Sequence, residues 1–145
     1  SKNGLKVDGI AGKQTLAAMG IFPAASTPAD KNLDLLAHII HGEARGEPYE
    51  GMVAVGAVVL NRVKDSRFPN SIPGVIYQPG AFDAVADGQI NLKPSSTAIR
   101  AARDALNGWD PTYGCIYYYN PVTATSKWIW SRPIVTKIGR HNFAK

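Results

Sequence analysis

Three carboxylates lie close together in the sequence and could perform acid–base chemistry. The only glutamates in the chain are Glu43, Glu47 and Glu50, and all three fall where one predicted helix ends and the next begins. A carboxyl group that stays protonated near neutral pH can act as a general acid. The position of each glutamate relative to the two helices therefore decides which of them suits that role.

Glu43 is the preferred candidate for the general acid. It is expected in the last turn of the first helix, where the negative end of the helix dipole disfavours a carboxylate and raises its pKa. Glu47 and Glu50 are expected at the positive start of the second helix, where they should stay ionised. The alternative is that all three are surface charges and helix caps, and we favour that alternative for Glu47 and Glu50.

The C-terminal part of the chain combines aromatic with basic residues. Aromatic residues crowd positions 109–130, and residues 111–145 contain Lys and Arg but no Asp or Glu. Such a surface suits sugar rings that carry anionic substituents, and it also suits the stacked bases of single-stranded nucleic acid. If the Tyr run forms a strand, Tyr118 faces the core while Tyr117 and Tyr119 share the other face.

Other reactive residue types give weaker signals. His38 and His41 are three residues apart rather than four, which is not the spacing of the His-Glu-x-x-His zinc helix. We expect ordinary polar histidines, no metal and no cofactor. Cys115 is the only cysteine, so it can form neither an internal disulfide nor a cysteine zinc site.

Two helices should position the glutamates. Apolar residues at helical spacing over 33–40 predict a helix that begins near Asn32, capped by Asp30 or Asn32, and ends near Gly46. A second helix is predicted from Pro48 to about Val63. It is apolar on nearly all sides, so it should be the central buried helix.

Shorter elements follow these two helices. Ser71 is expected to cap a short helix over 72–77, and Ser95 or Ser96 a clearer one over 97–106. Residues 115–119 and 132–137 alternate enough to predict a small hairpin or two extended arms. The predicted fold class is α+β, mostly helical.

The chain divides into three predicted segments. Residues 1–22 are too few to bury a core, residues 23–31 lack periodicity and carry two prolines, which is typical of a linker, and residues 32–145 form the main domain. Residues 7–18 fit VDG-x-x-G-x-x-T-x-x-A, which resembles the end of the three-helix peptidoglycan-binding module. Residues 1–22 are therefore interpreted as the C-terminal remnant of such a module.

Composition sets outer limits on function. The formal net charge is +5, and 45% of the 145 residues are hydrophobic, which indicates a globular domain. A basic surface favours an anionic partner, although on charge alone we prefer the alternative that the charge serves only solubility. Nucleic acid, a membrane surface and an acidic cell-wall polymer all fit this charge. The chain has no run of 18 apolar residues, so no membrane-spanning helix is expected.

A long motif around Glu43 decides among these partners. Residues 43–62 read EARGEPYEGMVAVGAVVLNR and resemble the signature E-A-R-G-E-P-Y-x-G-x-V-A-V-A-x-V-x-L-N-R of the SleB/CwlJ cell-wall hydrolase family, with Gly56 as a departure. Further matches are the Q-x-x-x-F stretch over 78–82, YYNP over 118–121 and IGRHNF over 138–143. The family's Q-F-S is Ala-Phe-Asp here, at 81–83.

The resemblance implies a fold, an activity and a location. The fold would be lysozyme-like, similar to lytic transglycosylases and resuscitation-promoting factors. The activity would be cleavage of spore cortex peptidoglycan during germination, by a protein exported to the cortex or to the outer surface of the inner spore membrane. Peptidoglycan would be the partner, with a regulatory protein of the dormant spore as a further one, and nucleic acid would not bind.

The resemblance also implies site residues. Glu43 corresponds to the family's single catalytic glutamate. From their position in matched segments and their chemistry, we nominate a set of residues for the glycan groove. They are Gln78, Phe82, Tyr117, Tyr119, Asn120, His141 and Phe143.

The reaction type depends on whether a second carboxylate takes part. Glycosidases usually need one about 5 Å from the acid for retention and about 6.5–9.5 Å away for inversion. Asp83 is the one further candidate near a matched segment. Without it, the C6 hydroxyl of muramic acid can attack C1 intramolecularly, as in lytic transglycosylases, which yields a 1,6-anhydromuramoyl end. A muramidase-type hydrolase that uses water and a wall-binding module without catalysis are the alternatives.

Overall fold

The computed structural model describes residues 28–145, and the segment interpreted as a peptidoglycan-binding remnant lies outside them. Residues 32–145 form a compact unit of their own. Six α-helices, one 3-10 helix and three strands make up the described part. They are α1 (Pro28–Ala44), α2 (Tyr49–Lys64), α3 (Ile72–Ile76), α4 (Asp83–Ala86), η1 (Gln89–Asn91), α5 (Ser96–Leu106), β1 (Tyr117–Tyr119), α6 (Lys127–Trp130), β2 (Ile134–Ile138) and β3 (His141–Ala144).

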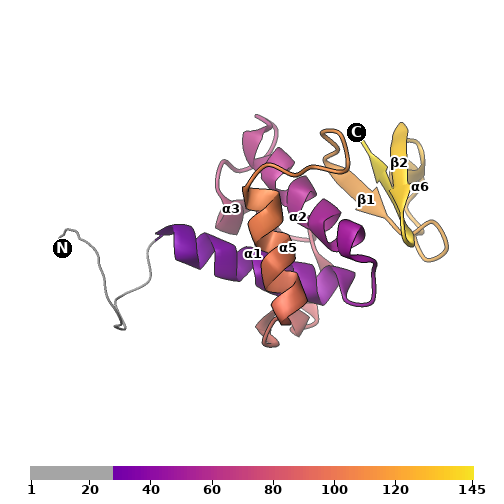
Figure 1. Ribbon diagram of the computed structural model, residues 1–145. Helices are drawn as coiled ribbons and strands as arrows, with labels where there is room; N and C mark the ends of the chain where they lie inside the picture. Colours follow the sequence, from indigo (N-terminus) through magenta and orange to yellow (C-terminus); the bar gives the residue numbers. More distant parts are fainter. Residues whose placement is uncertain (1–27) are drawn as a thin grey trace, which may run out of the picture. The chain divides into compact units, whose positions relative to one another are not determined.

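Helix α2 is the central element, as its sequence predicts. It packs against α5 and α3 on one side and against β1 and β2 on the other, and Figure 1 shows it running between the helical part and the sheet. One core cluster joins α1, α2, α3 and α5. A second cluster, with Val58 and Phe143, lies between α2 and the sheet. Burial toward both clusters explains why α2 is apolar nearly all round.

Most helix boundaries follow the predicted signals. Ser71 and Ser95 both occupy N-cap positions, and their hydroxyls accept the backbone N–H of Gly74 and Ala98. Gly46 has φ +89° just after α1, as expected of a residue that follows a helix. The predicted start of the second helix at Pro48 is one residue early, because Pro48 is the N-cap and α2 begins at Tyr49.

The start of α1 differs from the prediction. The helix begins at Pro28 rather than near Asn32, so Asp30 lies in its first turn instead of capping it. Residues 28–31 of the segment interpreted as a linker are therefore helical. The proline at the start explains this, because its fixed φ suits the first helical turn.

The sheet contains a strand that the pattern missed. Strands β2 and β3 form an antiparallel hairpin, and β1 pairs with β3, so the order is β1-β3-β2. Of the two alternatives predicted for residues 115–119 and 132–137, a hairpin between them is wrong, because each pairs with β3 instead. The alternative of two extended arms is confirmed, since β1 and β2 fall in these segments. The C-terminal residues, from His141 to Ala144, form the central strand and bring His141 beside the tyrosine run.

Of the helices over residues 28–145, none combines the length and the apolar character needed to cross a bilayer. Cys115 is buried and free. The α+β, mostly helical class is confirmed.

Candidate active site

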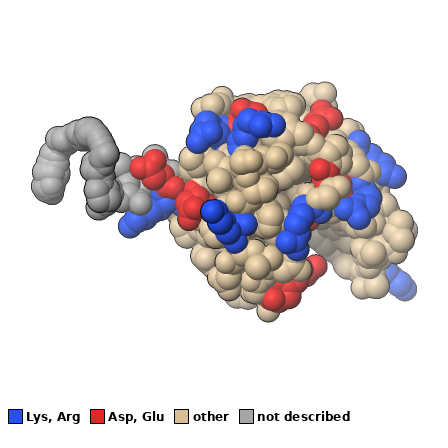
Figure 2. Space-filling view, turned by 60° about the horizontal axis from the view of Figure 1, so that its bottom comes forward, with Lys and Arg blue, Asp and Glu red and all other residues tan. Residues whose placement is uncertain are grey.

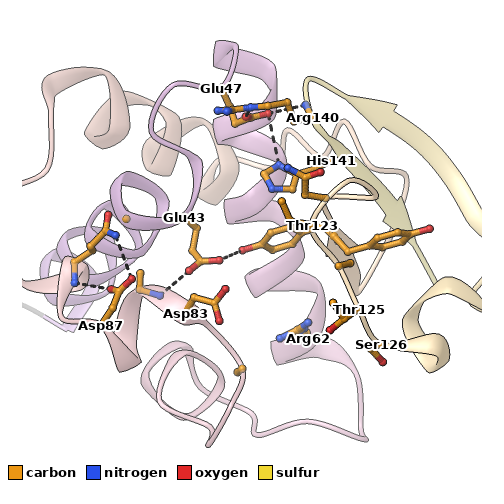
Figure 3. Close-up of a pocket in the computed structure, with 18 residues that line it drawn as sticks. Glu43, Glu47, Arg62, Asp83, Asp87, Thr123, Thr125, Ser126, Arg140 and His141 are labelled. Atoms are coloured by element: carbon orange, nitrogen blue, oxygen red, sulfur yellow. Dashed lines mark hydrogen bonds and ion pairs between the residues drawn. The ribbon is translucent and has the colours of Figure 1, made fainter.

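A cavity of about 640 Å³ lies where the helical part meets the sheet. The end of α1, helix α4, strand β1, the 120–126 loop and the β2–β3 turn all contribute to it, as Figure 3 shows. The lining is mostly polar. It comprises Gly42, Glu43, Glu47, Arg62, Ala81, Asp83, Ala84, Asp87, Gln89, Tyr118, Tyr119, Asn120, Thr123, Ala124, Thr125, Ser126, Arg140 and His141.

Glu43 is held in this cavity by two hydrogen bonds. Its Oε2 accepts the backbone N–H of Ala84 at 2.8 Å, and its Oε1 accepts the hydroxyl of Tyr118 at 2.5 Å. The residue lies in the last turn of α1, as predicted. Its partners come from α4 and β1, so three separate segments fix one carboxyl group.

The pKa of Glu43 is raised, in the direction that the sequence predicts. Burial of the carboxyl group is the largest cause. The hydrogen bonds from Tyr118 and Ala84 act against it, and the negative charges of Asp83 and Asp87 add to it. Burial thus has the main part, whereas the prediction from the sequence rests on the helix dipole. The arrangement favours a protonated carboxyl group, which a general acid requires.

Gly42 allows α4 to approach α1 closely enough for this contact. A Cβ atom built on Gly42 would lie 2.6 Å from Cβ of Ala84, well inside van der Waals contact. Any larger residue would push α4 away from α1 and so lengthen the bond from the N–H of Ala84 to Glu43. The glycine beside the acid is therefore needed for close packing.

Tyr118 supplies the second hydrogen bond. Burial and the nearby Glu43 raise the pKa of its phenol well above the usual value, so the hydroxyl stays protonated and donates. The rings of His141 and Phe143 lie 5.0 Å and 5.9 Å from its ring, measured between centroids. The prediction that Tyr118 packs toward the interior is confirmed, but its hydroxyl also reaches the candidate acid.

Glu47 is not the surface charge that the sequence suggested. Its side chain is only 2% exposed and accepts both the backbone N–H of Arg140 at 2.9 Å and its guanidinium Nε at 2.6 Å. Burial alone would raise the pKa of Glu47, but the contacts with Arg140 outweigh it and lower the pKa. Glu47 therefore stays ionised, and its role is to tie the α1–α2 junction to the β2–β3 turn.

Gly139 makes this tie sterically feasible. It has φ +58°, a backbone conformation that side chains disfavour, and a Cβ atom there would lie 2.9 Å from Cδ of Pro48 and still closer to the Glu47 carboxylate. His141 follows in the same turn region, with its Nδ1 3.5 Å from Oε1 of Glu47. Burial lowers the pKa of His141 although Glu47 opposes this, which favours the neutral imidazole.

The structure brings three of the seven nominated groove residues to the cavity. Tyr119, Asn120 and His141 line it. The other four, Gln78, Phe82, Tyr117 and Phe143, do not. Phe143 is fully buried in the cluster between α2 and the sheet, and Phe82 is 4% exposed in the main core. Phe82 and Phe143 therefore contribute to packing rather than to the surface of the cavity.

Tyr117 and Tyr119 both pack against tryptophans of α6, but only Tyr119 lines the cavity. Tyr117 packs edge-on against Trp128 with 5.1 Å between ring centroids, whereas Tyr119 is 8% exposed and lies beside Trp130. Tyr118 pairs with Phe143 in the sheet, whereas Tyr117 and Tyr119 pair with Ala144 and Asn142. Because side chains alternate along a strand, the two outer tyrosines lie on the face opposite to Tyr118, as predicted.

Several lining residues were not nominated from the sequence. Tyr118 and Arg62 belong to matched motifs, which was a usable signal, but their aromatic and aliphatic neighbours suggested the core. Asp83 was considered only as a second carboxylate. Asp87, Gln89 and the loop residues Thr123 to Ser126 gave no signal, because short polar segments carry no periodicity.

The histidines have the ordinary polar roles expected of them. His38 Nδ1 lies 2.6 Å from the carbonyl oxygen of Ile90, and His41 Nδ1 accepts the backbone N–H of Ser95 at 3.2 Å. Within residues 28–145, no three His, Cys, Asp or Glu side chains are grouped so as to hold a metal ion.

Comparison with known proteins identifies the family. A family model described as Cell Wall Hydrolase matches residues 46–144. The chain belongs to this family. The match begins at Gly46, three residues after Glu43. Cell Wall Hydrolase CwlJ of Bacillus subtilis is 31% identical over 125 residues, which are 81% of this chain and 86% of that protein.

Spore cortex-lytic enzymes within this family are more similar still. Those of Bacillus cereus and Bacillus subtilis are 58% and 54% identical, over 81% and 84% of this chain. The aligned parts are 45% and 41% of those proteins, so the chain spans less than half of the length of these relatives.

Solved structures agree with the family assignment. The catalytic domain of the Bacillus cereus SleB protein has a TM-score of 0.75 and 60% identity, covering 79% of this chain and 89% of that one. The catalytic domain of the germination-specific lytic transglycosylase SleB from Bacillus anthracis has a TM-score of 0.77 and 55% identity, covering 86% and 100%. The lysozyme-like fold expected from the sequence is thus confirmed.

Proposed function

We propose that this chain is a lytic transglycosylase domain that cleaves the β-1,4 bond between N-acetylmuramic acid and N-acetylglucosamine in spore cortex peptidoglycan. Glu43 is the general acid and then the base. The observation that carries the proposal is the state of Glu43, a carboxyl group held toward a polar cavity by Tyr118 and Ala84 with its pKa raised by burial.

The chemistry of the cavity suits a glycan strand. Backbone and hydroxyl groups of the 120–126 loop offer hydrogen-bond partners to sugar hydroxyls, and the half-exposed Trp128 and Trp130 stand next to that loop. The basic side chains do not form one continuous stripe on the face in Figure 2, where acidic side chains lie between groups of them. This distribution favours a glycan over a nucleic acid backbone, which selects for an unbroken basic track.

The reaction proceeds in two proton transfers at Glu43. The carboxyl group donates its proton to the glycosidic oxygen as the bond from C1 of the muramoyl residue to that oxygen breaks. The C6 hydroxyl of the same residue attacks C1, and its proton passes to the Glu43 carboxylate. The acid is restored, no water is consumed, and the new end is a 1,6-anhydromuramoyl group.

Asp83 is the competitor for the role of nucleophile or base in a hydrolase. It lines the cavity, and its charge acts on the pKa of Glu43. Its side chain is solvent-exposed at the first residue of α4, an environment that does not prepare a carboxylate for covalent attack. An intramolecular hydroxyl with a high effective molarity needs no such residue.

The products decide between the two reactions. Purified cortex is digested with the protein, and the released muropeptides are measured by mass spectrometry. An anhydro end is lighter than a reducing end by one water, so the proposal expects anhydro ends. Reducing ends alone would make the domain a muramidase-type hydrolase, and release of no muropeptide by the folded protein would favour a wall-binding module.

The names of the relatives support cortex as the substrate. The similar proteins from Bacillus cereus and Bacillus subtilis are spore cortex-lytic enzymes, and one solved neighbour is a germination-specific lytic transglycosylase. On this basis the place of action is the cortex of the spore. A regulatory partner in the dormant spore stays a prediction.

A further inference from the structure

Arg62 is a buried cation that faces the same cavity. It lies in the last turn of α2, is 9% exposed and belongs to the cavity lining. Figure 3 shows it on the side of the cavity where Thr125 and Ser126 are labelled, away from Glu47 and Arg140. The mechanism proposed for Glu43 gives this residue no task.

The neighbours of Arg62 hold its side chain without neutralising it. Its Nε donates to the carbonyl oxygen of Ile116 at 2.7 Å. Its guanidinium carbon lies 5.2 Å, 5.4 Å and 5.7 Å from the ring centroids of Phe68, Phe82 and Tyr117. One carbonyl and three aromatic rings stabilise a cation and fix its direction, but none of them carries a negative charge.

A comparison with Arg140 shows that Arg62 lacks an anionic partner. Arg140, the other cation of the cavity, has its Nε 2.6 Å from the carboxylate of Glu47. In residues 28–145, Arg62 has no carboxylate oxygen within the 4.0 Å of an ion pair. Glu43 lines the same cavity, but its carboxylate oxygens accept hydrogen bonds from Tyr118 and Ala84, and none from Arg62. A buried charge without a partner is costly, so an anion is expected to complete the site.

We infer that Arg62 binds a carboxylate of the muramoyl side branch of the substrate. The inference deepens the proposed function and rests on it for the identity of the ligand. The sugar rings and their N-acetyl groups are neutral, so the side branch supplies the negative charge of a peptidoglycan strand. A guanidinium group presents parallel N–H donors that match a carboxylate.

Two positions on the side branch could supply the carboxylate. The lactyl group of muramic acid ends in a carboxylate where no peptide is attached. Where a stem peptide is attached, that carboxyl group is an amide, and acidic residues of the peptide supply the charge. Both sources present the same chemistry to Arg62, and ligands with matched neutral forms distinguish them.

The test measures binding with a disaccharide that the enzyme cannot cleave. N-acetylglucosaminyl-N-acetylmuramic acid lacks the muramoyl-to-glucosaminyl bond. It is titrated into the full chain at pH 7 as the free lactyl acid and as its methyl ester. The same disaccharide carrying L-alanyl-D-glutamic acid is titrated as the diacid and as the diamide. The Nε–H signal of Arg62 in nuclear magnetic resonance spectra reports on the site directly.

In at least one pair we expect the charged ligand to bind ~10- to 100-fold more tightly than its neutral form, the usual range for a hydrogen bond to a charged group. A preference in the first pair identifies the lactyl carboxylate, and one in the second identifies the stem peptide. Equal affinities within both pairs would overturn the inference.

Variants test whether Arg62 causes the preference for the charged ligand over its neutral form. Arg62→Met should remove this preference while binding of the neutral ligands is kept, and Arg62→Lys should retain part of the preference. Arg132→Met is the matched control, because Arg132 also lies over Tyr117, at 5.8 Å, and donates its Nε to a backbone carbonyl, that of Lys145. A preference that persists in folded Arg62→Met would overturn the inference.

The binding result is independent of the cleavage result. If Arg62→Met does not fold, two measurements still test whether Arg62 binds a carboxylate. They are the binding of both ligand pairs by Arg62→Lys and the binding of the charged and neutral ligands by the unmodified protein. Because no bond is cleaved in this assay, a failure of the Arg62 inference leaves Glu43-dependent cleavage untouched. A failure of the proposed mechanism would show in a different experiment, as cleavage of cortex by the Glu43→Gln variant.

Discussion

The hydroxyl of Tyr118 donates to Oε1 of Glu43 at 2.5 Å, although 75 residues separate the two in the sequence. The bond joins the end of α1 to the middle of β1 and crosses the boundary between the helical part and the sheet. It favours the ionised form of Glu43, whereas burial favours the neutral form. The balance between these two effects sets the pH range in which the carboxyl group can donate a proton.

Glu43→Gln should abolish cortex cleavage while the protein stays folded. Loss of a general acid costs on the order of 100-fold or more in rate. The amide keeps an oxygen for the N–H of Ala84 and can donate its NH₂ to the oxygen of Tyr118, so the thermal midpoint should change little. Turbidity of decoated spores and a thermal melt measure the two effects. Lysis at a nearly normal rate by the folded variant would remove Glu43 from the mechanism.

Tyr118→Phe should shift the pH dependence of cleavage. The tyrosine bond lowers the pKa of Glu43, so its loss should raise that pKa further. Activity needs the protonated acid, and the alkaline limb of the pH–rate profile should therefore move to higher pH. Tyr117→Phe is the matched control, since Tyr117 lies outside the cavity lining. An unmoved limb in Tyr118→Phe would mean that the bond does not act on the titrating group.

Asp83→Asn separates the two reaction types. The charge of Asp83 raises the pKa of Glu43, so the variant should lose activity at lower pH than the unmodified protein does. Under the transglycosylase mechanism the maximal rate should be largely kept. Asp87→Asn removes a charge that acts in the same direction and serves as the control. A fall on the order of 100-fold or more in Asp83→Asn alone would point to a second catalytic carboxylate.

Glu47→Gln should destabilise the fold more than Glu50→Gln does. The buried carboxylate of Glu47 is bound to Arg140, and we expect a cost of about 1–3 kcal/mol, toward the lower end because the Arg140 side chain is 65% exposed and solvent screens it. Glu50 is exposed in the first turn of α2, where a charge contributes roughly 0.3–1 kcal/mol. Chemical denaturation measures both values, and equal effects would contradict the structural difference.

The sign of the pH dependence provides a second check on Glu47. Its pKa is lowered in the folded state, so its stabilisation is fully present above the pKa of the unfolded chain, about 4.3. It is lost as the pH falls through the folded value. The difference in unfolding free energy between the unmodified protein and Glu47→Gln should therefore be largest above about pH 5 and shrink on acidification. A difference that grows below pH 4 would rule out this linkage.

Removal of residues 1–27 should leave a folded and active domain. Helix α1 begins at Pro28, and residues 32–145 form a compact unit of their own. A cooperative melt and cleavage of solubilised cortex by the shortened chain are the expected results. Loss of the cooperative transition would mean that the first 27 residues contribute to the core.

Local sequence signals determined the helical part of the molecule and the place of Glu43 in it. Pro48, Ser71 and Ser95 mark helix starts through backbone chemistry that acts within a few residues. The apolar pattern of α2 predicted its central position, and the family motif singled out Glu43. These inferences hold because their physical causes are short in range and recur in every helix.

Only the tertiary structure decided which side chains meet at the site. The nominated Phe143 packs between α2 and the sheet, while Tyr118, assigned to the core, reaches Glu43. Glu47 has its partner 93 residues away in Arg140. A strand pattern tells which residues share a face but not which face meets a cavity. The burial that raises the pKa of Glu43 likewise exists only once α1, α4 and β1 have packed together, because desolvation is a property of the assembled walls and not of any one segment.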